Sequence, residues 1–329
     1  MNRSPLAAGL ALALCTAPAV ATPAPTPDAG TLDTIVVTAT RSPTPIARGL
    51  ASTTVLDRAA IEQAQAPDLI DLLARQAGVD VSRTGGPGSV STLFLRGGNS
   101  NHVLVLVDGV RVNSVQQGLY DFANLPLDRI ERIEIVRGPR AALWGSDAIG
   151  GVIQVFTRDP GQRGAQARFG THQRIEGAAQ WGVSGERGSF GVGGGVQDAE
   201  GYNVSTPSSF GFDPDRDGFR NRHLSVGGRT ALGTQALAVN LLSTVADVEF
   251  DRGLTESHSV SGGATLGGPL AARWSHSLAL GEAREDLKTV SSFGSRFESR
   301  RRSADWLHDL ALNDRHALLF GLNHVDEDA

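Results

Sequence analysis

From about residue 164 onward, apolar residues alternate with small or polar residues with a period of two. Leu318, Phe320 and Leu322, for example, fall on one face of a predicted strand. Strands of this kind, separated by turns, are typical of a membrane β-barrel with lipid outside and water or protein inside. Nine strands are expected, with starts near Ala165, Ile175, Ser189, Arg222, Ala236, His258, Arg273, Phe297 and His316.

A soluble β-sandwich is the alternative for these strands. The 40 glycines argue against it, and so does the start of the chain. Residues 1–21 have the form of a secretory signal peptide, with a positive start, an apolar run too short to span a bilayer and a small-residue site at residues 19–21. Residues 22–32 are rich in proline, alanine and threonine and are expected to be a flexible linker.

Several classes of chemistry are disfavoured by composition. Cys15 is the only cysteine and lies within the predicted signal peptide, so no disulfide, thiolate metal site or cysteine nucleophile is expected. The net charge of −5 argues against nucleic acid as a partner. The sequence has neither a phosphate-binding P-loop nor an HExxH zinc motif, and its eight histidines are scattered. We therefore expect a protein that is not an enzyme.

Two glycine-rich segments lie between the linker and the predicted barrel. Residues 102–113 form a predicted hairpin around Asp108-Gly109, a turn of the primed type. Residues 133–136 and 152–157 are two further strands, separated by a Gly138-Pro139 break and a short helical turn. The sequences LFLRGGNSNHVLVLVDGVRVN and IERIEIVRGPRAALWGSDAIGGVIQVFT, in this order, resemble the plug domain of TonB-dependent outer-membrane receptors. The alternative is an isolated α+β domain.

The resemblance implies an α+β plug domain at residues 45–160, followed at residues 164–329 by the N-terminal part of a membrane β-barrel of antiparallel strands. The other elements expected in the plug are a strand at residues 53–56, a helix at 57–65, a helix that begins at Pro67 and runs to Gln76, a strand at 79–82, a glycine-rich loop at 84–89 and a strand at 94–96.

Nine strands do not close a plugged transporter barrel, which uses about 22. We therefore expect the chain to be the N-terminal portion of a receptor, whether a fragment, a truncated gene or one half of a split receptor. The resemblance implies a multi-pass β-barrel in the outer membrane of a Gram-negative bacterium, in contact with its lipid.

A run of β-branched residues precedes the predicted plug. Such a segment suits β-augmentation, in which a free strand adds to the edge of a partner's sheet. The alternative is a plain edge strand of the plug. The segment DTIVVTA resembles the TonB box, closely in the form found in cobalamin receptors, and the resemblance implies that the TonB protein binds it. The residues are Asp33, Thr34, Ile35, Val36, Val37, Thr38 and Ala39.

The resemblance also implies two sets of residues within the plug. The loop at the plug apex, where this family contacts its ligand, contains Gln116, Gln117, Leu119 and Tyr120. Arg96 and Arg137, each followed by glycine, stand where the family's arginines pair with barrel glutamates and hold the plug in place. Ordinary surface arginines are the alternative.

An acidic loop falls between two predicted strands. Residues 213–218 look like the start of an EF-hand, but the twelfth position is Leu224 rather than glutamate, so an EF-hand is rejected. Resemblance to the cobalamin receptors, whose DxDGF loop binds calcium, implies a structural calcium site here. A solvated acidic loop is the alternative. The residues implied as ligands are Asn203, Asp215, Asp217, Asp247 and Asp251.

Together these features favour TonB-dependent import of cobalamin or a related corrinoid across the outer membrane. A receptor for a siderophore or another nutrient is the first alternative. A truncated plug protein that binds TonB without transporting anything is the second.

Overall fold

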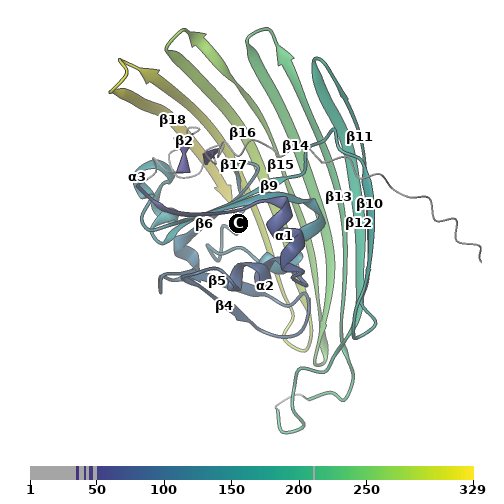
Figure 1. The fold of residues 1–329 in the computed structure, drawn as a ribbon. Coiled ribbons are helices and arrows are strands. Elements are labelled where there is room, and N and C mark those ends of the chain that lie inside the picture. The colour runs from purple at the N-terminus through teal and green to yellow at the C-terminus, as the bar shows by residue number, and fades with distance from the viewer. Residues whose placement is uncertain (1–34, 37–40, 42–43, 47–49, 210–211) are drawn as a thin grey trace, which may run out of the picture. The chain divides into compact units, whose positions relative to one another are not determined.

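The computed structural model describes residues 35–36, 41, 44–46, 50–209 and 212–329 (Figure 1). The predicted signal peptide and linker lie outside the described residues. So do Asp33, Thr34, Val37, Thr38 and Ala39 of the predicted TonB box. No helix in the described part of the chain is long and apolar enough to cross a membrane.

The plug contains a five-stranded sheet in the order β3-β8-β9-β6-β7. Strands β6 and β9 run parallel, and the other pairs run antiparallel. Every residue of β6 is buried, which explains why its sequence VLVLV shows no polar alternation. The strands are β3 (Ser52–Leu56), β6 (Val103–Val107), β7 (Val110–Arg111), β8 (Ile130–Arg137) and β9 (Gly151–Thr157).

The predicted hairpin between β6 and β7 is present. Asp108 has φ 48° and Gly109 has φ 85°, and positive values at both central residues are what a type I′ turn requires. The carboxylate of Asp108 accepts hydrogen bonds from the backbone N–H of Thr157 at 2.9 Å and from its hydroxyl at 2.6 Å. The turn is thereby tied to the end of β9, and burial raises the pKa of Asp108.

Two short helices cover part of this sheet's core. Helix α1 (Arg58–Ala64) is capped by Asp57, which accepts the N–H of Ala60 at 2.8 Å, and its Ile61 is buried as predicted. Helix α2 (Leu69–Ala74) differs from the prediction at both ends. Asp68 caps it by accepting the N–H of Asp71 at 2.9 Å, so Pro67 lies before the helix rather than at its first position. The helix also ends before Gln76.

Strands β4 (Val79–Arg83) and β5 (Ser91–Leu95) form a separate two-stranded sheet, with the predicted glycine-rich loop between them. The strand predicted at residues 94–96 is present as β5, but with different bounds. The strand begins earlier, and Arg96 has a left-handed φ of 51°, which ends the extended backbone. The remaining plug elements are α3 (Ala141–Trp144) and the 3₁₀ turns η2 (Ser100–His102), η3 (Phe122–Asn124), η4 (Leu127–Arg129) and η5 (Ser146–Ala148).

The second large sheet has nine antiparallel strands, each paired with its neighbours in sequence, which confirms the number predicted (Figure 1). Within the described residues, the first and last strands pair on one side only, so the sheet does not close. The strands are β10 (Gly164–Phe169), β11 (Ile175–Gly185), β12 (Gly188–Tyr202), β13 (Asp217–Leu232), β14 (Gln235–Phe250), β15 (Gly253–Ala271), β16 (Trp274–Val290), β17 (Ser295–Ala311) and β18 (Ala317–Asp328).

Two strands begin earlier than predicted. β13 begins at Asp217 rather than near Arg222, and β15 begins at Gly253 rather than near His258. Their first residues, DGFRN and GLTES, lack a regular apolar face. Main-chain pairing with the preceding strand extends them beyond the segment that the alternation reveals.

The plug packs against one face of the nine-stranded sheet. Leu242 of β14 belongs to the plug's hydrophobic core, and glycines on β15 and β16 let Val110 approach. A Cβ added at Gly263 would lie 2.9 Å from Val110. Polar contacts also hold the plug against the sheet. The Asn221 amide donates to the Asn124 carbonyl at 3.0 Å, and Arg129 donates to Gln180 at 3.0 Å. His223 contacts Asp128 at 3.1 Å.

Candidate functional site

Three carboxylate groups gather where β13 begins. Oxygens of Asp215, Asp217 and Asp251 all lie within 4.8 Å of one another. Asp217 is only 2% exposed; its Oδ2 accepts the backbone N–H of Val204 at 3.0 Å. Its Oδ1 is buried and has no hydrogen-bond partner among the described residues. A buried carboxylate oxygen that lacks a donor is costly, and oxygen groups at this spacing suit a divalent cation such as calcium.

Asn203 lies beside this acidic cluster (Asp215, Asp217 and Asp251) but uses its side chain to close its own loop. Its Oδ1 accepts the N–H of Ser205 at 2.9 Å, and its Nδ2 donates to the carbonyl of Asp213. The backbone N–H of Asp213 in turn donates to Asp251 at 3.3 Å. Asn203 therefore helps to shape the loop next to the cluster.

Asp247 does not join the acidic cluster. In the pairing of β13 with β14, Phe219 lies opposite Val248, and both are buried. Side chains alternate between the two faces of a strand, so Asp247 points to the face opposite Val248, whereas Asp217 shares the face of Phe219. The structure thus brings together three of the five residues implied as ligands.

The predicted ligand loop, residues 115–120, is closed by backbone hydrogen bonds that involve Ser114. The N–H of Ser114 donates to the carbonyl of Leu119 at 2.8 Å, and the N–H of Gly118 donates back to Ser114 at 2.8 Å. Gln116 and Gln117 are exposed at its tip. Leu119 is partly buried, so the two glutamine side chains present the most accessible polar groups of the loop.

Asn113 holds the base of this loop. Its side chain is 4% exposed and makes three hydrogen bonds. Its Oδ1 accepts the N–H of Val105 at 2.8 Å, and its Nδ2 donates to the carbonyls of Val103 at 2.9 Å and Gly118 at 3.0 Å. One amide therefore links β6 to the loop.

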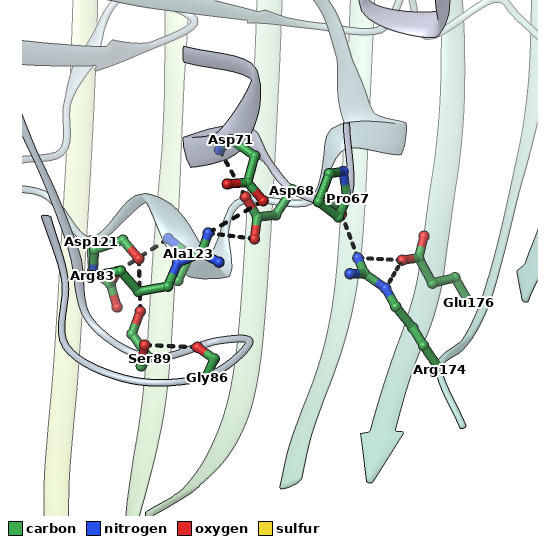
Figure 2. Close-up of polar contacts among 11 residues, drawn as sticks. Pro67, Asp68, Asp71, Arg83, Gly86, Ser89, Asp121, Ala123, Arg174 and Glu176 are labelled. Atoms are coloured by element: carbon green, nitrogen blue, oxygen red, sulfur yellow. Dashed lines mark hydrogen bonds and ion pairs between the residues drawn. The ribbon is translucent and has the colours of Figure 1, made fainter. Parts of the chain in front are cut away.

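Tyr120 and Asp121 anchor the other end of the loop. The Tyr120 ring packs edge-on against Phe122, with centroids 5.1 Å apart, and burial raises its pKa. Asp121 accepts hydrogen bonds from the N–H groups of Ala123 at 3.1 Å and Ser91 at 3.0 Å (Figure 2). Burial raises the pKa of Asp121 to about 7, although these two hydrogen bonds favour the ionised form.

Arg96 and Arg137 lie near each other, where β5 and β8 end. A Cβ at Gly78 would lie 3.7 Å from Arg96 and 3.9 Å from Arg137. Arg137 is 6% exposed and donates to the hydroxyl of Thr54 at 2.8 Å, while its Nε and Nη2 have no hydrogen-bond partner in the described part of the chain. Burial, and then the neighbouring Arg96, lower the pKa of Arg137. The two guanidinium groups are placed to donate hydrogen bonds to one carboxylate.

Two residues of the predicted TonB box are described. They form β1 (Ile35–Val36), which pairs antiparallel with β2 (Thr44–Pro45). The backbone of these two residues is therefore extended and paired within the chain itself.

Two features of the site were not anticipated from the sequence. Asp121 stands alone in the apolar run LYDFA, and a single carboxylate in such a run is a signal that could have drawn attention to it. The side chain of Ser114 is hydrogen-bonded to Glu285 of β16, so a barrel strand contacts the ligand loop. These residues are far apart in sequence, and no local pattern predicts that contact.

The chain is similar in sequence to known proteins. Residues 45–152 match the TonB-dependent Receptor Plug Domain family. The chain is 42% identical over 183 residues to a Vitamin B12 transporter BtuB of Vibrio vulnificus, and 41% identical over 199 residues to one of Vibrio cholerae. These matches cover 54% and 59% of this chain but 30% and 32% of the relatives. The chain thus aligns with about a third of the length of the curated relatives.

A solved structure shows the same fold at low identity. BauA, the ferric preacinetobactin receptor of Acinetobacter baumannii, superposes with a TM-score of 0.71 at 14% identity, over 89% of this chain and 49% of BauA. The plug and the sheet of nine antiparallel strands define the class: the chain has the fold of a TonB-dependent outer-membrane receptor. The two curated relatives quoted above are both named as vitamin B12 transporters. The class comprises receptors and transporters rather than enzymes.

Proposed function

We propose that this protein is an outer-membrane receptor for cobalamin or a related corrinoid and that TonB drives import. The observation that carries the proposal is the acidic cluster. Two of its residues, Asp215 and Asp217, lie in the segment DRDGF, which matches the calcium-binding pattern of cobalamin receptors. The relatives at 42% and 41% identity, both named as vitamin B12 transporters, support it. The substrate would meet the exposed Gln116 and Gln117, with Leu119 and Tyr120 behind them.

The cluster would hold a structural calcium ion through Asp215, Asp217 and Asp251. Calcium takes about six to eight oxygen ligands, so three carboxylates leave positions for carbonyl groups and water. Asn203 would contribute by shaping the adjacent loop. Asp247, which lies on the opposite face, would reach the ion only if that hairpin rearranged. Without a cation the three carboxylates repel one another, and the loops that carry them separate.

Binding of cyanocobalamin to outer membranes that contain the protein tests the proposal. We expect tighter binding in calcium chloride than in EGTA. Asp215→Ala combined with Asp217→Ala should abolish the difference. Asp314→Ala is the matched control because its side chain is 95% exposed in the turn between β17 and β18.

Each outcome of this experiment separates one alternative. Equal corrinoid affinity with and without calcium would refute the calcium site, while the proposed corrinoid substrate would stand. Binding of a ferric siderophore, with no corrinoid binding in either buffer, would favour the first alternative. Binding of TonB without binding of any nutrient would favour a plug protein that does not transport.

Residues 33–39 would bind TonB by adding as a strand to the edge of TonB's sheet. The backbone pairing of Ile35 with Pro45 and of Val36 with Thr44 supports this proposal because these two residues have the extended form that β-augmentation needs. Binding would exchange this short internal pairing for pairing with the partner.

Arg96 and Arg137 would anchor the plug by donating hydrogen bonds to a carboxylate of the barrel. Arg137 is buried, and its Nε and Nη2 lack hydrogen-bond partners in the part of the chain that the structure describes. A glutamate facing these atoms would satisfy them and offset the repulsion between the two guanidinium groups.

The face of the nine-stranded sheet opposite the plug would contact membrane lipid. Val239 and Leu280 lie in register on either side of Ala264, and they are 44% and 51% exposed. Trp274 and Trp306 are also exposed on β16 and β17, at 38% and 44%. An exposed apolar face edged by tryptophans suits a bilayer and its interface.

A further inference from the structure

The plug loop at residues 84–90 rests on the aromatic ring that follows the acidic cluster. Phe219 is 3% exposed and comes two residues after Asp217 on the same face of β13. A Cβ added at Gly88 would lie 1.9 Å from Cδ2 of Phe219, so the ring lies directly against the glycine backbone. Gly88 has φ +79°, which a side chain would also disfavour. The ring packs on its own sheet against Ala246 and Val248.

A second contact joins the same loop to the acidic cluster. The N–H of Val204 donates to Asp217 Oδ2 at 3.0 Å, so Asp217 fixes the position of Val204. A Cβ added at Gly86 would lie 3.3 Å from Cγ1 of Val204. Residues 84–90 therefore contact two residues that are directly linked to the cluster. Phe219 follows Asp217 by two residues in β13, and Val204 is hydrogen-bonded to Asp217.

The loop passes these contacts on to the rest of the plug. Ser89 donates from its hydroxyl to the carbonyl of Gly86 at 2.7 Å, and the hydroxyl of Ser91 donates to the carbonyl of Ser89 at 2.9 Å. The N–H of Ser91 then donates to Asp121, the residue that follows Tyr120 of the ligand loop (Figure 2). A set of hydrogen bonds thus runs from Gly86, which contacts Val204, to Asp121 beside the ligand loop. Gly88, which contacts Phe219, is joined to this set through its peptide bond to Ser89.

We propose that Phe219 and Gly88 couple cation binding at the acidic cluster to the order of plug loop 84–90. The inference rests on the cation site proposed above and adds positioning residues to it. A cation draws Asp215, Asp217 and Asp251 together and so fixes Phe219 and Val204 against the loop. When the carboxylates repel one another, this support weakens and the loop gains freedom.

A spin label at residue 84 measures the order of the loop without any substrate. Thr84 is exposed and lies at the loop's first position, so Thr84→Cys in a Cys15→Ser background gives a single label site in the full chain, reconstituted in detergent micelles. Electron paramagnetic resonance spectra are compared in calcium chloride and in EGTA, and calorimetry measures calcium binding separately. We expect calcium to immobilise the label.

Two substitutions remove the contact from opposite sides. Phe219→Ala deletes the ring, and Gly88→Ala places a methyl group where the ring lies. Both should leave calcium binding in place and lose the calcium-induced immobilisation. Phe293→Ala is the control because this ring is 88% exposed in another hairpin, and it should behave like the parent. If Phe219→Ala fails to fold, Gly88→Ala decides the matter.

The outcomes distinguish the coupling from the site. If calcium binds and immobilises the label equally in the parent, Phe219→Ala and Gly88→Ala, the coupling is overturned while the cation site stands. If calcium binds to the parent and the label does not respond, the coupling is likewise overturned. If calcium does not bind to the parent at all, the cation site is wrong and the inference falls with it.

Discussion

Asn113→Ala should loosen the ligand loop far more than its small change in volume suggests. The side chain is 4% exposed and makes three hydrogen bonds to backbone groups of Val105, Val103 and Gly118. Each bond contributes about 1 kcal/mol net, and a buried donor left without a partner costs about 1–3 kcal/mol. We therefore expect local destabilisation of about 3–5 kcal/mol.

Hydrogen exchange at the amide of Val105 measures this effect directly, since that amide donates to Asn113 Oδ1. A loss of about 3–5 kcal/mol corresponds to exchange faster by about 10²–10⁴-fold, provided that exchange proceeds through local opening. Asn113→Asp keeps the acceptor but removes both donated bonds, so it should give an intermediate increase at Val105 and the full loss of order at Gly118.

Asn99→Ala provides the comparison, because the Asn99 side chain accepts only one exposed bond, from the N–H of Ser100 at 2.9 Å. Exchange at Val105 should be unaffected there. If Asn113→Ala changes exchange at Val105 by less than about threefold, the three bonds do not hold the loop and the reasoning is refuted.

Three further predictions concern other parts of the chain. Burial raises the pKa of Asp121 to about 7, so the plug should lose stability as the pH rises from the carboxyl's ordinary range to about 7. Asp121→Asn should flatten this dependence, as measured by thermal melts across that pH range. Gly151→Ala places a Cβ 2.3 Å from the Val136 carbonyl and should cost about 2–6 kcal/mol in denaturant unfolding, whereas Gly164→Ala, with nothing within 4 Å, should be neutral. Val36→Pro should lower nutrient uptake while surface binding persists, as assayed with radiolabelled substrate; a parallel loss of binding would indicate misfolding instead.

The sequence predicted those parts of the fold that local chemistry controls. The Asp108-Gly109 turn was predictable because few residue pairs accept positive φ at both positions. The nine strands of the larger sheet were predictable because apolar residues alternate along them with small or polar residues. The start of α2 was missed because Pro67 and Asp68 are both good helix-starting residues, and the hydrogen bond from Asp71 decides between them.

The candidate site was predictable in part. Spacing in the sequence brought Asp215 and Asp217 to notice, but only strand register shows that Asp247 lies on the other face while Asp251, in the following turn, reaches the cluster. The contact of Phe219 with Gly88 joins the nine-stranded sheet to the plug, and it depends on how the plug packs against that sheet. Sequence periodicity carries no information about that packing.

The plug sheet has a high contact order, and this has a consequence for the sequence of folding events. β3 pairs with β8, so residues 52–56 cannot pair until residues 133–137 have been synthesised. β6 pairs with β9, so residues 103–107 likewise cannot pair until residues 151–155 are present. Every pair in the nine-stranded sheet joins consecutive strands. Closing long loops before their contacts form costs entropy and slows folding. Although the plug is made first, its sheet cannot close until residue 155 has been synthesised, whereas the barrel strands can assemble hairpin by hairpin.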